Sequence, residues 1–209
     1  MRSSAAKPRV RKNPEDRRLE ILDTASQLAL RMGLEKVTMK LVAEHLEVRP
    51  GLISHYFRTI DELLCAAFER AATREREALF EGQGEELKGL AALCAFLRQA
   101  TAPGFSDLGK LWLDARHQSR YRAALREVVI AQELLTNQQL STCIEQALEM
   151  GEISGIDPEQ AATEILIVVD GAGSYVNTSS EEATAALAGV TWRMSERALG
   201  LEAGSLNAR

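Results

Sequence analysis

The chain has 209 residues, of which 45% are apolar and 26% are charged, and its formal net charge is −5. This composition supports a folded core, and the absence of any run of about eighteen apolar residues argues against a membrane span. The basic start of the chain has no apolar segment after it, as a signal peptide would, and Cys65, Cys94 and Cys143 form no metal-binding pattern. A reducing, cytoplasmic location is therefore expected.

Charge is divided unevenly along the sequence. Residues 1–60 hold 12 lysines and arginines against 7 aspartates and glutamates, whereas residues 61–209 hold 13 against 23. A basic head on an acidic body is typical of a protein whose head alone meets phosphates. The alternative is a disordered basic tail, because residues 1–12 supply much of the excess.

The first predicted helix follows a basic arm. Residues 1–12 are polar and lack periodicity, which predicts disorder. Asn13 and Pro14 are typical of the N-cap and first position of a helix. The apolar residues at helical spacing are Ile21, Ala25, Leu28, Ala29 and Met32, and Gly33 ends the pattern.

Two short helices and a tight turn come next. Thr38 caps the first, whose inner face is Val42, Ala43 and Leu46, and Glu47-Val48 forms the turn. The second runs from about Pro50 to Phe57, with Val48, Ile53 and Phe57 facing inward. Its outer residues are Arg49, Leu52, Ser54, His55 and Tyr56. This arrangement predicts a helix-turn-helix.

The rest of the chain also has helical periodicity. Thr59 to Glu62 forms a predicted capping box that begins a long helix reaching about Glu81, and Gly82-Gln83-Gly84 interrupts the pattern. Further helices are predicted over 85–100, 106–117, 119–150, 157–176 and 179–199. No segment alternates with period two, so the predicted fold class is all-α, with about nine helices.

The head resembles the TetR family of one-component transcriptional regulators. The similarity lies in Thr38-Met39-Lys40-Leu41-Val42-Ala43-Glu44-His45-Leu46-Glu47-Val48, in Gly51-Leu52-Ile53-Ser54-His55-Tyr56-Phe57 and in Leu63. The second stretch looks most like the branch that contains the choline-responsive repressor of glycine-betaine synthesis. The resemblance implies a DNA-binding domain at 13–60, after the arm at 1–12, and an effector-binding and dimerisation domain at 61–209.

The resemblance also implies a homodimeric repressor that a small-molecule effector releases from a palindromic operator in double-stranded DNA. The expected DNA contacts are Thr38, Lys40, Arg49, Gly51, Leu52, Ser54, His55 and Tyr56. Dimerisation is expected through helices at about 157–177 and 180–199. Three residues depart from the family pattern: Glu47 replaces a glycine, Arg49 a small N-cap and Ile60 a lysine.

By the same resemblance, the effector pocket is expected among helices 85–101, 106–117, 119–150 and 157–177. The candidate lining residues are Phe96, Phe105, Trp112, Tyr121, Cys143 and Tyr175, with Asp114, His117 or Asp170 as polar anchors. Aromatic residues at helical spacing are more often core than pocket, and Asp170 also suits a cap or a dimer hydrogen bond. No cofactor and no metal are expected.

Other functional classes have weaker support in the sequence. Asp114 and His117 stand three residues apart and could face one metal in an enzyme, but a helical di-iron site needs further carboxylates and histidines. The sequence has no nucleotide-binding or hydrolase motif. The remaining alternatives are a helical small-molecule-binding protein and a dimeric adaptor, each with a head that does not bind DNA.

Overall fold

Nine α-helices and one short 3-10 helix make up the computed structural model, which describes residues 13–80, 87–102, 106–175 and 180–206 and has no strand in those ranges. The elements are α1 (Pro14–Met32), η1 (Leu34–Lys36), α2 (Met39–His45), α3 (Pro50–Tyr56), α4 (Ile60–Phe80), α5 (Gly89–Ala100), α6 (Ser106–Ser119), α7 (Ala123–Glu149), α8 (Pro158–Ser174) and α9 (Glu181–Ala198). The all-α prediction is confirmed.

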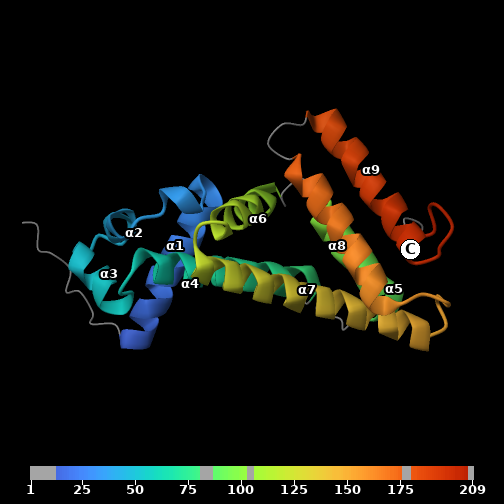
Figure 1. The fold of residues 1–209 in the computed structure, drawn as a ribbon, viewed down its shortest axis with the longest axis horizontal. Coiled ribbons are helices and arrows are strands. Elements are labelled where there is room, and N and C mark those ends of the chain that lie inside the picture. The colour runs from blue at the N-terminus through green and yellow to red at the C-terminus, as the bar shows by residue number, and fades with distance from the viewer. Residues whose placement is uncertain (1–12, 81–86, 103–105, 176–179, 207–209) are drawn as a thin grey trace, which may run out of the picture.

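The molecule is elongated, with α1 to α3 at one end and α8 and α9 at the other (Figure 1). The long helices α4 and α7 run side by side between the two ends, and α6 lies over them. Within the described residues, no helix is both long and apolar enough to cross a membrane.

Helix starts follow the local sequence. Five side chains accept the backbone N–H three residues later: Asn13 before α1, Thr38 before α2, Thr59 before α4, Asp157 before α8 and Ser180 before α9. The predicted capping box at α4 is shifted by one residue. Glu62 donates its N–H to Thr59 Oγ1 at 3.1 Å, but its carboxylate accepts the N–H of Arg58, at 2.8 Å.

Two predicted helix starts were wrong because tertiary contacts and turns set them. Leu87 and Lys88 are not helical, and α5 begins at Gly89, which has a φ of +57°. The Glu152 carboxylate accepts the Leu90 N–H at 2.8 Å and so caps α5 from a distant segment. Likewise, residues 120–122 separate α6 from α7, so the helix expected from residue 119 begins at Ala123.

Two clusters of buried side chains hold the fold together. The first joins α1, α2, α3 and the first half of α4 with Leu111 and Ala115 of α6. The second joins α5, the later part of α7, α8 and α9 with Leu79 of α4. Helix α4 thus belongs to both clusters. The predicted inner face of α1 is buried except for Met32, which is 48% exposed beside the helix end.

Some predictions concern residues that the structure does not describe. The basic arm at 1–12, the break at Gly82-Gln83-Gly84 and the candidate pocket residue Phe105 all lie outside the described ranges.

Candidate nucleic-acid interface and ligand cavity

The turn between α2 and α3 depends on Glu47. Its φ is 53°, so it lies in the left-handed region, and it is the only non-glycine residue with a positive φ among those described. The Val48 N–H donates to the Ala43 carbonyl at 2.9 Å and the Glu47 N–H to the Glu44 carbonyl at 3.1 Å. These two bonds form a Schellman motif, in which glycine usually takes the left-handed position.

Helix α3 is fixed from its inner side. Ile53 and Phe57 are fully buried, and the Arg18 guanidinium of α1 lies 5.0 Å from the centre of the Phe57 ring. The N-cap residue Arg49 makes no side-chain cap, as its replacement of a small polar residue predicts. The inner contacts therefore set the face that α3 turns to solvent.

The eight predicted DNA contacts lie in α2 and α3 or at their N-caps, and none of them is buried. Leu52 and Tyr56 are half-buried, and the exposed members are Thr38, Lys40, Arg49, Gly51, Ser54 and His55. The edge of the His55 ring meets Tyr56 at 5.3 Å between ring centres. Lys40 forms only an exposed ion pair with Glu44, at 3.8 Å, which leaves its ammonium accessible to a phosphate.

Gly51 is open on its outer side. A Cβ built on this residue would meet no heavy atom within 4 Å, so packing within the chain does not require glycine there. A missing side chain at this point lets another molecule approach the α3 backbone closely.

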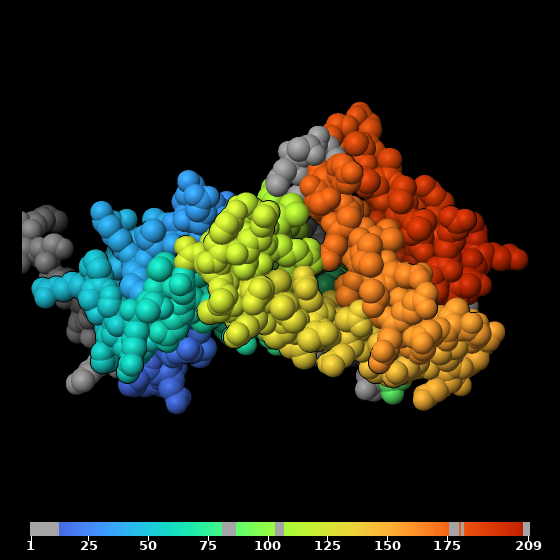
Figure 2. All heavy atoms as spheres, in the orientation of Figure 1, coloured from blue at the N-terminus to red at the C-terminus, as the bar shows by residue number. Residues whose placement is uncertain are grey.

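A cavity of about 720 Å³ lies in the body. Its lining comes from α4, α5, α6, α7, α8 and α9, and a recess is visible between α6 and α8 in Figure 2. Apolar side chains, among them Leu79, Phe96, Leu166 and Leu187, form most of the wall. The size and the largely apolar lining are typical of a small-molecule site.

Charged residues gather at one part of this wall. Arg116 of α6 donates to Glu133 of α7 at 2.8 Å and to Asp170 of α8 at 2.5 Å. Its guanidinium also lies 5.1 Å from the centre of the Trp112 ring. Arg116 thereby ties three helices together at the cavity.

Glu75 of α4 is the most buried acid in this group, with 8% of its surface exposed. Its Oε2 accepts the indole N–H of Trp112 at 2.6 Å. Burial raises the pKa of this carboxyl to about 7, against the smaller opposing effect of the Trp112 hydrogen bond, and the charge of Asp170 adds to the rise. Near neutral pH the side chain is therefore close to half protonated.

Helix α6 connects the cavity to the head. The Trp112 ring meets the buried Phe68 ring edge-on, at 5.0 Å between centres, inside the first cluster. Two residues on, Asp114 Oδ2 accepts the N–H of Leu34 at 3.3 Å. Gly33 permits this approach, because a Cβ there would lie 2.5 Å from the same carboxylate oxygen.

Comparison with known proteins finds a family match in the head. Residues 21–67 match the family model described as "Bacterial regulatory proteins, tetR family". A curated relative, the HTH-type transcriptional regulator BetI of Burkholderia mallei, is 29% identical over 121 residues, which cover 54% of this chain and 60% of that protein. The chain thus spans only about three fifths of the relative's length.

Solved structures extend the similarity over the body. A TetR-family regulator from Rhodococcus sp. shares 26% identity at a TM-score of 0.70, over 84% of this chain and 96% of its own. The head of the chain matches the TetR family model, and the fold of the described residues is similar to that of a TetR-family regulator. A regulator from Saccharomonospora viridis, solved in complex with choline, has the same fold at a TM-score of 0.70 and 20% identity, over 85% of this chain and 94% of its own.

The candidate pocket residues of this chain separate into two groups. Phe96, Trp112 and Asp170 line the cavity, and effector contact remains a prediction for them. The structure places the other described candidates elsewhere: Asp114 holds Leu34, His117 meets Tyr121 edge-on, Cys143 is packed in the second cluster, and Tyr121 and Tyr175 are 75% and 56% exposed. Helical spacing identifies a face of a helix but not the neighbour that covers it.

Sequence reasoning missed α4 and α9 as walls of the cavity. The missed polar residues include Glu75, Arg76, Arg116 and Glu133, and α9 contributes Thr184 and Thr191. A weak signal was present for Glu75, because it shares the α4 face with Ala71, Ala72 and Leu79, all of which are buried. An acid on an apolar helix face marks either a structural contact or a site.

Proposed function

We propose that this chain is a ligand-responsive transcriptional regulator of the TetR family: a homodimeric repressor that a small-molecule effector releases from a palindromic operator. The observation that carries the proposal is the accessible polar surface of α2 and α3, on a head whose first 60 residues have a net charge of +5. A short helix presented in this way fits the major groove, with side chains for both phosphates and base edges.

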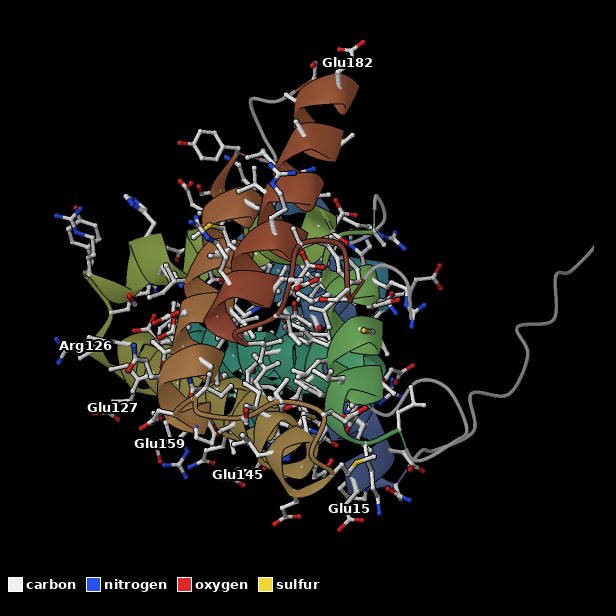
Figure 3. The ribbon with its side chains drawn as sticks, turned by 90° about the vertical axis from the view of Figure 1, so that its right-hand side faces the viewer. Glu15, Arg126, Glu127, Glu145, Glu159 and Glu182 are labelled. Atoms are coloured by element: carbon white, nitrogen blue, oxygen red, sulfur yellow. The ribbon has the colours of Figure 1, made fainter. Side chains whose placement is uncertain are left out.

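The charge of the body supports docking through the head alone. Residues 61–209 carry a net charge of −10. Glu127, Glu145 and Glu159 point outward from α7 and α8 in Figure 3, and all three are exposed. An acidic body is repelled by phosphates, so it favours an approach in which α3 meets the duplex first.

A dimer is supported by apolar side chains that α8 and α9 leave uncovered. Ile167 is 65% exposed on α8, and Val190 and Met194 are each 40% exposed on α9. A twofold axis through these helices would cover the same patch on both chains and present two copies of α3 to DNA.

Release by an effector is supported by the helices that the cavity and the head share. Helix α4 carries Phe68 in the first cluster and Glu75 at the cavity, and α6 carries both Trp112, at the cavity, and Asp114, which holds Leu34. A ligand that shifts either helix changes the position of the head, and its coupling to DNA binding is reciprocal. The choline in the Saccharomonospora viridis regulator makes choline a reasonable first effector to test.

The deciding experiment is selection of DNA from a random pool by the full-length protein, followed by footprinting of the enriched sequence. An inverted repeat with half-sites about one helical turn apart is expected. Affinity for it should fall steeply between about 50 and 200 mM salt, because phosphate contacts release counterions. If no sequence is enriched, the protein is instead a helical small-molecule-binding protein with a head that does not read DNA.

A further inference from the structure

Glu75 differs from the other acids of the cavity in having no cationic partner. Among the described residues, no lysine, arginine or histidine nitrogen lies within 4.0 Å of its carboxylate, which accepts a hydrogen bond from the neutral Trp112 indole. A carboxylate that is 8% exposed and unpaired is costly when ionised. The ionised form of Glu75 therefore has no cationic partner in direct contact among the described residues.

The two arginines whose charges act on Glu75 hydrogen-bond to other side chains. Arg76 of α4 donates to Gln132 of α7 at 2.7 Å, and Arg116 of α6 is shared by Glu133 of α7 and Asp170 of α8. The described lining from α5 and α9 carries no charged side chain. With Glu75 ionised, the cavity wall holds three carboxylates against two guanidinium groups.

We propose that the effector is an organic cation with an apolar body, and that its charged group is seated against the Glu75 carboxylate. This inference rests on the proposed function, since it assigns the ligand class of the same cavity. Trp112 fixes the carboxylate on one side, while the apolar wall accepts the body of the ligand. An anion would add a like charge beside Glu75, and a neutral molecule would leave the carboxylate unpaired.

Binding of such a cation is linked to a proton. Glu75 titrates near neutral pH in the empty cavity, for the reason given above, and the bound cation favours its ionised form. Below the pKa the carboxyl loses a proton when the cation binds, so affinity rises with pH there. Well above it the carboxylate is already ionised and affinity levels off. Affinity should therefore rise by roughly tenfold between pH 6 and pH 8.

The test uses the full-length protein and matched probes in isothermal titration. Choline, tetramethylammonium and tetraethylammonium are the cations, and 3,3-dimethylbutan-1-ol is the neutral counterpart of choline with nearly the same shape. Titration at pH 6, 7 and 8, in two buffers of different ionisation enthalpy, measures both affinity and released protons. At least one cation should bind, at least about tenfold tighter than the neutral alcohol, and should release protons at pH 6 to 7.

Glu75→Gln is the decisive variant, and Glu133→Gln is its control because Glu133 is paired with Arg116. Glu75→Gln should lower cation affinity about tenfold or more at pH 8 and abolish proton release, whereas Glu133→Gln should keep the pH dependence. Circular dichroism establishes that both variants fold. The inference is overturned if none of the three cations binds at pH 8, or if a folded Glu75→Gln protein binds them with the same affinity and pH profile.

Operator binding by the ligand-free protein separates this inference from the proposed function. If the operator is bound but cation affinity does not depend on Glu75, the proposed regulatory function is supported and the assignment of a cationic effector is wrong. If a cation binds in a way that depends on Glu75 but no operator is found, the cation site is supported and the proposed DNA-binding function is wrong.

Discussion

Glu47 stabilises the turn through its backbone but occupies a conformation that suits glycine better. A side chain in the left-handed region costs about 1 kcal/mol, so Glu47→Gly should raise the free energy of unfolding by about that amount. For a chain of this size, thermal denaturation should show a melting temperature about 2–4 °C higher.

The matched control for this substitution is Glu44→Gly, at an exposed position within α2. There the backbone is helical, so the same change should lower the melting temperature. Equal effects of the two substitutions would contradict a role for the left-handed conformation.

Gly51 offers a second residue-scale test, because its outer side is open and its conformation is helical. Gly51→Ala should raise the free energy of unfolding by about 0.5 kcal/mol, since alanine favours the helix. The added methyl should nevertheless weaken operator binding, measured by fluorescence anisotropy, by about tenfold if DNA approaches the backbone here. A variant that is stabilised and binds the operator normally would rule out this close approach.

At the scale of elements, α6 is the helix that touches both the cavity and the head. Asp114→Ala removes the acceptor of the Leu34 N–H, a hydrogen bond worth about 1 kcal/mol. The variant should bind the effector in the cavity, but the effector should shift operator affinity about fivefold less than in the parent protein.

Asp114→Asn is the control for this prediction, because the amide oxygen can still accept the Leu34 N–H. The two variants are compared by measuring operator affinity with and without effector. If the effector shifts the operator affinity of Asp114→Ala as much as that of the parent protein, the cavity and the head are coupled through α4 instead of α6.

For the whole molecule, the exposed apolar surface of α8 and α9 sets the expected assembly. Val190→Asp introduces a charge that twofold symmetry places twice in the proposed interface. Sedimentation equilibrium should then give a monomer, and operator affinity should fall by about 100-fold because two linked heads no longer bind together.

Leu19→Asp serves as the control, since it makes the same kind of change at a 45% exposed apolar side chain of α1. This variant should remain a dimer. A Val190→Asp protein that also sediments as a dimer would move the interface to another surface.

The sequence alone determined the features that depend on contacts between residues a few positions apart, such as helix caps and the buried face of a short helix. The caps at Asn13 and Thr38 and the inward pair Ile53 and Phe57 specify the helices of the head, because a cap bonds three residues ahead and a short helix can bury only one face.

Tertiary structure alone decided the contacts between distant segments. Glu152 fixes the start of α5 from 62 residues away, and Asp114 turns to the head instead of the cavity. Glu75 and Trp112 meet at the cavity because α6 packs against α4. Periodicity shows which side of a helix is apolar, but the element packed against that side depends on the whole chain, so only Phe96, Trp112 and Asp170 of the described candidates line the cavity.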